Sequence, residues 1–473
     1  MEKMIPTLKQ LVLLFALPLL LGFSSIQSQQ PLPLIATGYF FDGNIRRPLL
    51  IQSDSLGDTW QYPASIHQAP LPADFVDGGL GRSSCNNFVC IATGNYLNTG
   101  ESSVPLLMQS SDRGLKWSLQ DIKHRPTDFQ TGQFNDSICT DTRCIAVGMY
   151  ANSNGSRPLL AVSDSKGNWH YSMIPDNSLP TDFKEGWFNT VRCSNIGCLA
   201  AGTYLDTQTQ RHPLIMTSKD DGLSWNTAVY NDELIDLAGN SDSYLFASSC
   251  DSSLCVAVGE YTNPQNTVAP LLLHSTNAGK NWDKPSFPLP SDFESGWFRA
   301  VDCKAGFCIA VGSYNNGEIT IPMLVSSADG GKHWQLQKPV QDSELGTHLE
   351  YGSYESASCN ETGCIAGGSF SNYFNTYPLI TISHDKGQSW HSPSSARTSV
   401  PEAELGNGSF GTVKCQQNIC IAAGDYTIDT VYYPLLALSN DSGMTWSFPE
   451  SINNPDILPS NFINGYFYSD KGM

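Results

Sequence analysis

The chain has 473 residues, of which 15% are charged, and its formal net charge is −19. A strongly acidic protein repels nucleic acid and anionic membrane surfaces, so we expect neither as a partner. Glycine and small polar residues are abundant, which favours a turn-rich all-β fold over a helical one.

Residues 1–28 have the pattern of a secretory signal peptide. Lys3 and Lys9 give a positive start, and the apolar run from Leu11 to Phe23 that follows is short for a membrane span. We therefore expect cleavage and a secreted mature chain, residues 29–473, without a membrane span. Its location would be extracellular or, in a bacterium, periplasmic. An uncleaved membrane anchor is the alternative.

One unit of about 55 residues repeats along the mature chain. In one complete copy, four β-rich segments separated by turn residues cover residues 186–193, 198–204, 213–218 and 225–230. We predict that such segments form strands A, B, C and D of one antiparallel sheet. A tryptophan begins the last segment of every copy, at Trp60, Trp117, Trp169, Trp225, Trp282, Trp334, Trp390 and Trp446.

Cysteines flank the turn between strands A and B in seven copies. The pairs are Cys85/Cys90, Cys139/Cys144, Cys193/Cys198, Cys250/Cys255, Cys303/Cys308, Cys359/Cys364 and Cys415/Cys420. An even number of cysteines behind a signal peptide predicts structural disulfides in an oxidising compartment. Each would close a six-residue loop and stabilise the fold by about 2 kcal/mol. Zinc is the alternative, but it favours tighter spacings and paired clusters.

Strand B is small and apolar on both faces, as in residues 309–312. A strand of this kind must be covered on both sides, which the stacked blades of a β-propeller provide. Strand C begins with a proline followed by apolar residues in several copies, as at residues 105–107. Proline at the first position of a strand costs no ladder hydrogen bond.

The turn between strands C and D has the pattern Ser-x-Asp-x-Gly-x-x-Trp. It is complete at residues 110–117, 218–225, 327–334, 383–390 and 439–446. The aspartate can accept backbone N–H bonds, the glycine can adopt a positive φ, and the tryptophan buries a large apolar surface. Three copies depart from the pattern: Ser55 and Asn277 replace the aspartate, and the copy at residues 163–169 is one residue short.

This turn resembles the Asp-box, or BNR repeat, of a family that includes sialidases, secreted glycosidases, sortilin-type receptors and a photosystem assembly factor. The resemblance covers nearly the whole mature chain and implies a β-propeller. It also implies that the box is a structural turn, so Asp112 and its equivalents are not expected to be catalytic.

The two ends of the mature chain are complementary parts of one repeat. The N-terminal end begins with a strand B at residues 34–39, and residues 459–468 match the approach to strand A and strand A itself. We predict that the C-terminal strand completes the N-terminal blade, which gives eight four-stranded blades in a closed ring. Seven or nine blades are alternatives if one repeat is malformed, and two smaller propellers would need a linker that the sequence lacks.

A second motif, Pro-x-Asp-Phe, leads into strand A, on the face opposite the cysteine turns. We expect ligand-binding residues in this motif and in the Gly-Trp-Phe that follows it in two copies: Asp128, Asp182, Trp187, Asp292 and Trp297. Aspartate and tryptophan around a channel mouth would suit carbohydrate or peptide capture. In the structural alternative, the aspartate caps the loop and the aromatic rings fill the space between blades.

No unique catalytic constellation stands out, and we assign no catalytic residue, no metal and no cofactor. Sialidase chemistry would need three arginines, and only Arg46-Arg47-Pro48 comes near the Arg-Ile-Pro signature of that family. Our leading hypothesis is a secreted, monomeric, non-catalytic protein that binds a glycan or an extracellular protein through its loop-rich face. The alternatives are a sialidase-like or glucanase-like glycoside hydrolase, and an assembly factor for an exported protein.

Overall fold

The computed structural model divides the chain into two compact units, Met1–Pro31 and Leu32–Met473, and the fold below is that of the second. It describes residues 32–67, 71–230, 242–263, 265–338, 348–393, 395–398, 407–449, 452 and 458–467. The predicted signal peptide, residues 1–28, lies outside the described residues. No helix within the described ranges is long and apolar enough to cross a membrane.

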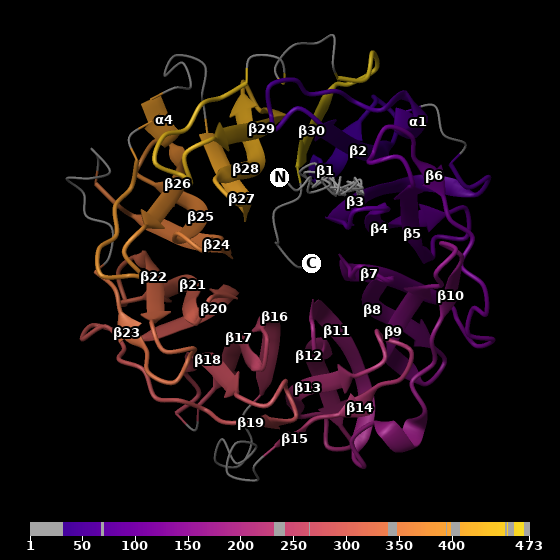
Figure 1. The fold of residues 1–473 in the computed structure, drawn as a ribbon, viewed down its shortest axis with the longest axis horizontal. Helices are drawn as coiled ribbons and strands as arrows, with labels where there is room; N and C mark the ends of the chain where they lie inside the picture. Colours follow the sequence, from indigo (N-terminus) through magenta and orange to yellow (C-terminus); the bar gives the residue numbers. More distant parts are fainter. Residues whose placement is uncertain are drawn as a thin grey trace, which may run out of the picture. The chain divides into compact units, whose positions relative to one another are not determined.

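The second unit is built almost entirely of antiparallel β-meanders (Figure 1). The first sheet contains β1 (Leu34–Phe41), β2 (Arg46–Ser53) and β30 (Asn464–Phe467). The second contains β3 (Phe75–Cys85), β4 (Cys90–Asn98), β5 (Ser103–Ser110) and β6 (Ser118–Leu119). The third contains β7 (Thr131–Cys139), β8 (Cys144–Asn152), β9 (Gly155–Ser163) and β10 (Trp169–Tyr171). The fourth contains β11 (Phe183–Ser194), β12 (Gly197–Asp206), β13 (Arg211–Ser218) and β14 (Asn226–Thr227).

The remaining sheets follow the same plan. The fifth contains β16 (Ser243–Asp251), β17 (Leu254–Thr262) and β18 (Val268–Ser275). The sixth contains β20 (Ser295–Lys304), β21 (Phe307–Asn315), β22 (Thr320–Ser327), β23 (Gln335–Leu336), β24 (Tyr351–Cys359), β25 (Cys364–Ser371) and β26 (Thr376–Ser383). The seventh contains β27 (Asn407–Gln416), β28 (Ile419–Ile428) and β29 (Val431–Ser439). A short parallel pair, β15 (Val229–Tyr230) with β19 (Asn281–Trp282), and the helices α1 (Ala64–His67), η1 (Asp176–Ser178) and α4 (Ser395–Thr398) lie between them.

Most sheets have four strands once the shortest pairings are included. Where a fourth strand is missing, a single antiparallel bridge replaces it directly after the tryptophan of the repeat. These bridges join Gln52 to Gln61, His274 to Asp283, Ile382 to His391, and Leu438 to Ser447. The predicted strand D is therefore present but short.

Within the described residues, hydrogen bonding defines seven sheets of three or more strands, whereas the sequence predicts eight blades. The difference has a local cause, because the sixth sheet consists of two meanders joined by one parallel pair, Thr320 with Tyr351. Neighbouring sheets pack face to face in chain order, with β3 against β7, β7 against β11, and so on to β27. This stacking is that of a β-propeller (Figure 1).

The C-terminal strand completes the first sheet, as the sequence predicts. Strand β30 pairs with β1 from Asn464 opposite Phe41 to Phe467 opposite Gly38, and it also packs against β28 and β29. The two ends of the described fold are thereby joined in one sheet, with β30 at its edge. A Cβ at Gly38 would lie 1.9 Å from the carbonyl oxygen of Tyr466, so only glycine permits this pairing.

The turn that follows strand C forms the hydrogen bonds expected from its sequence. In residues 218–225, the Ser218 hydroxyl donates to Asp220 Oδ1 at 2.8 Å and accepts from the Gly222 N–H at 2.8 Å. Asp220 Oδ1 accepts from the Ser224 N–H at 2.9 Å, and the Trp225 indole donates to the Gly222 carbonyl at 2.9 Å. Gly222 has φ +86°, which explains why glycine recurs at this position.

All seven predicted disulfides are present, and each joins the end of a strand A to the start of a strand B. The strand B cysteine of every pair is buried in the core. These buried cysteines are Cys90, Cys144, Cys198, Cys255, Cys308, Cys364 and Cys420. These seven sulfurs pack in the core, and the purely structural role expected of the cysteines stays a prediction.

The disulfide turns lie on the same face of the propeller as the turns between strands C and D. Thr142, beside one disulfide, donates to Asp221 in the following sheet's turn at 2.8 Å, and Asn418 donates to the Asn440 carbonyl at 2.9 Å. We call this face the disulfide face, and the opposite one, formed by the B–C loops and the approaches to strand A, the loop face.

Candidate functional site

The Pro-x-Asp-Phe motif forms a tight turn that holds the start of strand A to its own sheet. In one copy, the Phe183 N–H donates to the Pro180 carbonyl at 3.1 Å, and the Phe183 ring stacks on Tyr204 of β12 with centroids 5.9 Å apart. The Tyr204 hydroxyl donates to Asp182 Oδ1 at 3.3 Å. The motif therefore links the loop to strand B of the same sheet.

The three predicted aspartates are not brought together. Asp292 accepts from the Tyr314 hydroxyl at 3.4 Å, as Asp182 does from Tyr204, and Asp128 accepts from the Asn152 amide at 2.5 Å. Each lies on a different sheet and is engaged with that sheet. All three remain exposed, so a role in ligand contact stays a prediction for them.

The two predicted tryptophans occupy equivalent positions on the innermost strands of their sheets. Trp187 lies opposite Thr203, and Trp297 lies opposite Ser313. Both side chains are half-buried. The two tryptophans differ in their surroundings. Among the described residues, only Trp297 has a cation beside its ring, because the Arg299 guanidinium carbon lies 5.5 Å from the ring centroid.

Arg299 occupies a β-bulge, and the bulge recurs in the innermost strand of successive sheets. The bulged residues have no partner in the register to strand B, and they are Gly81, Asn135, Asn189, Phe246, Arg299, Glu355 and Gly411. A bulge redirects a side chain, and bulges are frequent beside functional sites. The same backbone feature thus presents glycine in two meanders, asparagine in two others, and phenylalanine, arginine and glutamate in the remaining three.

Two of these bulge residues have an evident structural task. The Asn135 amide donates to the Phe188 carbonyl at 2.7 Å, and the Asn189 amide donates to the Leu245 carbonyl at 2.8 Å. Each asparagine therefore links its innermost strand to the next one. In the three following meanders, phenylalanine, arginine and glutamate replace asparagine, and this link cannot form in the same way.

Phe246, Arg299 and Glu355 belong to a group of seven residues on β16, β17, β20 and β24 that we call the bulge cluster. It consists of Tyr244, Phe246, Glu260, Trp297, Arg299, Tyr351 and Glu355. The Arg299 guanidinium carbon lies 4.7 Å from the Phe246 ring centroid, and the Tyr244 and Phe246 rings stack with centroids 6.2 Å apart. Tyr351 is 45% exposed and the others are half-buried, so the cluster is accessible to a ligand.

Charge in the bulge cluster centres on Arg299. Burial raises the pKa of Glu260, and the Arg299 guanidinium opposes this rise. Burial, followed by the Glu355 carboxylate, raises the pKa of Tyr351, and the Arg299 guanidinium partly opposes this rise. One guanidinium therefore interacts electrostatically with Glu260 on β17 and with Tyr351 on β24, and the cluster as a whole can both donate and accept hydrogen bonds.

An aromatic loop tip extends the same region outward on the loop face. Tyr373 and Phe374, between β25 and β26, are 75% and 86% exposed. A hydrogen bond to Glu350 raises the pKa of Tyr373, and His348 stacks on the Tyr373 ring at 6.4 Å. Glu350 directly precedes Tyr351 of the bulge cluster, so the two aromatic surfaces are adjacent along the chain.

On the disulfide side of the innermost strands, a buried carboxylate joins three sheets. Asp136 on β7 accepts from Arg192 Nη1 at 2.5 Å and from the Val191 N–H at 2.9 Å, both on β11, and lies 3.8 Å from Arg82 Nε on β3. Burial alone would raise the pKa of Asp136, but Arg192, Arg82 and two backbone N–H groups lower it. These contacts hold the carboxylate as a link between β3, β7 and β11.

Asp302 makes the corresponding link on the other side of the propeller. Its carboxylate accepts from the Ser249 hydroxyl at 2.8 Å on β16 and from the Cys359 N–H at 2.7 Å on β24. Burial raises its pKa despite these bonds. Lys414 of β27 is exposed, yet the surrounding protein and Arg192 lower its pKa, while Asp136 and Asp302 oppose that shift.

Sequence reasoning did not find the bulge cluster apart from Trp297, nor the Asp136 and Asp302 links. The available signal was a break in the repeat, because aligned copies of strand A carry different residues at the bulge, from glycine and asparagine to phenylalanine, arginine and glutamate. Within the described residues, no group of three or more histidine, cysteine, aspartate or glutamate side chains could hold a metal ion.

No protein-family model matches the chain, and no curated protein matches it. Among solved structures, the chain is similar to an ulvan lyase of polysaccharide lyase family PL25 bound to -[GlcA(1-4)Rha3S]- (11% identity, 80% of this chain and 95% of that one, TM-score 0.47). It is also similar to a GH74 enzyme of Niastella koreensis (12% identity, 86% and 68%, TM-score 0.38). A third similar structure is the Trypanosoma rangeli sialidase in complex with sialic acid (12% identity, 76% and 53%, TM-score 0.38). At these identities the similarity is one of fold.

Proposed function

We propose that this protein binds a glycan at the bulge cluster. The observation that carries the proposal is the change of bulge residue from a structural asparagine to Phe246, Arg299 and Glu355 in three consecutive meanders. Aromatic faces pack against the C–H faces of sugar rings, and a guanidinium with carboxylates can bind ring hydroxyls through directed hydrogen bonds. The exposed rings of Tyr373 and Phe374 would extend the contact to further sugar units.

The scaffold in this proposal is an eight-bladed propeller of the Asp-box family. Its support is a glycine that recurs in strand B where a Cβ would lie 1.8–2.1 Å from a strand A carbonyl oxygen: Gly38, Gly94, Gly148, Gly202, Gly259, Gly312, Gly368 and Gly424. These eight equivalent positions count the two meanders of the sixth sheet as separate blades. The single Thr320–Tyr351 pair would then be a contact between blades.

We also propose that the protein acts outside the reducing cytosol, as a secreted monomer. Seven disulfides would not persist among cytosolic thiols, and residues 1–28 have the pattern of an export signal. Because both ends of the first sheet come from one chain, the propeller closes without a second copy.

Glycan-array screening of the secreted protein, followed by calorimetry with the glycan that binds, tests the binding proposal. Arg299→Ala and Trp297→Ala should each weaken binding by about tenfold or more, or about 1.4 kcal/mol. Gln133→Ala is the matched control, because Gln133 occupies the position of Trp297 on β7. If the wild type binds no glycan, or if all three variants bind as the wild type does, the proposal is wrong. Capture of a protein partner instead, by pull-down from secreted material, would favour the recognition or assembly of an exported protein.

A glycoside hydrolase is the second candidate, and Glu260 is the observation that favours it. Burial raises the pKa of this carboxyl group, as a general acid requires, and Glu355 supplies a second carboxylate near the same arginine. Release of reducing sugar from a bound glycan would support hydrolysis, and Glu260→Gln should then abolish release while binding persists. A wild-type protein that binds but releases nothing excludes this candidate.

A further inference from the structure

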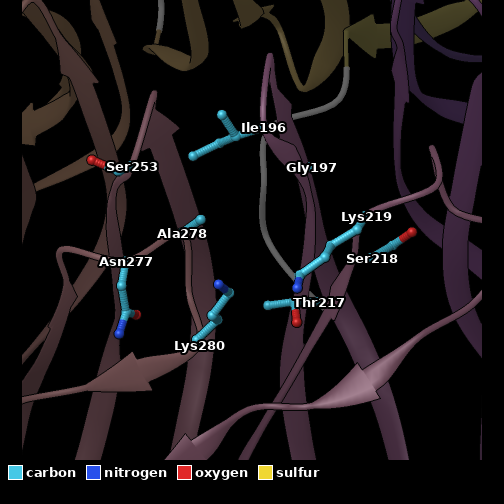
Figure 2. A pocket seen from close by; sticks show the side chains of 9 residues that line it. All are labelled: Ile196, Gly197, Thr217, Ser218, Lys219, Ser253, Asn277, Ala278 and Lys280. Carbon is cyan, nitrogen blue, oxygen red and sulfur yellow. The ribbon is translucent and has the colours of Figure 1, made fainter.

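A cavity of about 270 Å³ lies on the disulfide face, away from the bulge cluster (Figure 2). One wall comes from the fourth sheet, with Thr217 and Lys219 at the end of β13. The other comes from the fifth sheet, with Asn277 and Lys280 in the turn that follows β18. Ligand pockets in proteins begin at about 300 Å³, so this cavity suits a small ion or one group of a larger molecule.

The charge of the cavity is opposite to that of the protein. The chain has 45 acidic and 26 basic residues, yet the cavity lining contains two lysines and no aspartate or glutamate. Figure 2 shows Lys219 and Lys280 extending into the gap from its two walls. In the part of the chain that the structure describes, neither lysine forms an ion pair. Two facing ammonium groups repel each other, and a bound anion would relieve that repulsion.

Asn277 explains why the cavity lacks a carboxylate. Complete copies of the turn carry aspartate at this position, whereas Asn277 Oδ1 accepts from the Ser275 hydroxyl at 3.1 Å and from the Asn281 N–H at 2.9 Å. Asp220 Oδ1 makes the same two bonds in the preceding turn. The amide therefore preserves the turn while removing one negative charge beside Lys280.

The carboxylate that follows Lys219 in the chain is engaged within its own turn. Asp220 follows Lys219 in the chain but does not line the cavity, and both of its oxygens accept hydrogen bonds within its own turn, from Ser218 and Ser224. By contrast, Lys332 has the place of Lys280 in the next turn, where Asp329 keeps its charge and accepts from the Lys332 N–H at 3.1 Å. The two turns differ in charge but share their backbone hydrogen bonds.

We propose that this cavity binds a tetrahedral oxyanion, sulfate or phosphate, either free or as an ester, between Lys219 and Lys280. The Thr217 hydroxyl and the Asn277 amide, which also line the cavity, add donors of the kind that such oxygens accept. The site is separate from the proposed glycan site and would be occupied independently of it.

The test is calorimetric titration of the full-length protein with sodium sulfate, inorganic phosphate and a sulfated monosaccharide, with sodium chloride at matched ionic strength as the reference. We expect the divalent oxyanions to bind and chloride not to bind. The double variant Lys219→Gln, Lys280→Gln should weaken binding by about tenfold or more, since it removes both charge-assisted contacts. Tighter binding of the sulfated sugar than of free sulfate would identify an ester as the ligand, and the reverse would identify the free ion.

Two further variants separate the site from general surface charge. Asn277→Asp restores the carboxylate of the other turns, so it should weaken oxyanion binding while the melting temperature without ligand stays close to that of the wild type. Lys332→Gln removes one positive charge from the neighbouring turn and should leave binding unchanged. The proposal is overturned if chloride acts as sulfate does, or if Lys332→Gln weakens binding as much as the double variant.

Discussion

The disulfide face and the bulge cluster are built from the same repeat, but side chains recur from copy to copy on the first and differ between copies in the second. On the disulfide face, the Ser218–Asp220 bonds recur with nearly the same distances at Ser439 and Asp441. At the bulges, asparagine in two meanders gives way to phenylalanine, arginine and glutamate in the next three meanders. A side chain that recurs in every copy serves the scaffold, whereas a single binding site must come from side chains that do not recur.

The comparison also shows how much a structural turn can change without failing. Asn277 replaces aspartate and keeps the bonds to Ser275 and Asn281. In the first copy, Ser55 accepts from the Thr59 N–H at 2.9 Å in place of a carboxylate. The turn needs an acceptor at this position and does not need its charge.

Removal of a repeat tryptophan should have the largest effect on stability. Trp282 is 1% exposed and its indole donates to the Gly279 carbonyl at 2.8 Å, so Trp282→Ala should cost about 3–5 kcal/mol. Denaturant unfolding measures this cost, with Trp297→Ala as the partner variant on the inner strand. An equal cost for both tryptophans would contradict the division into scaffold and site.

Loss of one disulfide should come next. Replacing Cys303 and Cys308 together by serine opens a six-residue loop and should lower the free energy of unfolding by about 2 kcal/mol. Glycan binding should be retained at temperatures where the variant is folded, because the bulge cluster lies at the other end of β20. A binding defect as large as that of Arg299→Ala would show that the two regions are coupled.

The turn aspartates should make the protein sensitive to acid. Hydrogen bonds from the Ser389 hydroxyl and N–H lower the pKa of Asp385 to about 2, below its ordinary value of 3.8. A lowered folded pKa stabilises the fold above about pH 4, and this contribution is lost as the pH falls from 4 to 2. In Asp385→Asn, where Asn277 shows that an amide fits, unfolding free energies at pH 6 and pH 3 should differ less than in the wild type, by up to about 1 kcal/mol after solvent screening. An unchanged pH dependence would argue against this carboxylate as a source of acid sensitivity.

Glu355→Gln should have the smallest effect on stability. The residue is half-buried at a bulge and has no partner in the strand register, so we expect a change within about 0.5 kcal/mol in denaturant unfolding. Glycan affinity should fall in the same variant. A loss of stability comparable to that of the disulfide variant would place Glu355 in the scaffold instead.

Features confined to one repeat were predictable because their causes are local. The cysteine spacing, the Ser-x-Asp turn and the glycine at positive φ each act over fewer than ten residues, and the structure contains the corresponding bonds. Closure by residues 464–467 was also predictable, since the two chain ends carry complementary parts of one unit. The number of sheets differs from the predicted number of blades, because one parallel pair joins two neighbouring meanders into a single sheet.

The bulge cluster could not be predicted in the same way. Arg299 has no partner in the strand register because Phe298 and Ala300 lie opposite consecutive residues of β21. This register depends on both strands, so the sequence of one strand does not reveal the bulge. The links made by Asp136 and Asp302 each join strands of three meanders, and nothing adjacent to either residue in the chain indicates their partners.

The amino-acid sequence by itself determined the repeat, its turns, its disulfides and the closure of the first sheet by the last strand. These features follow from short-range patterns that recur in each copy of the repeat, so they could be recognised by comparing the copies. Only the tertiary structure decided which irregular residues meet: Trp297 and Arg299 with Phe246, and Lys219 with Lys280. Such residues are separated by a strand or by a whole blade, and packing between sheets alone brings them together.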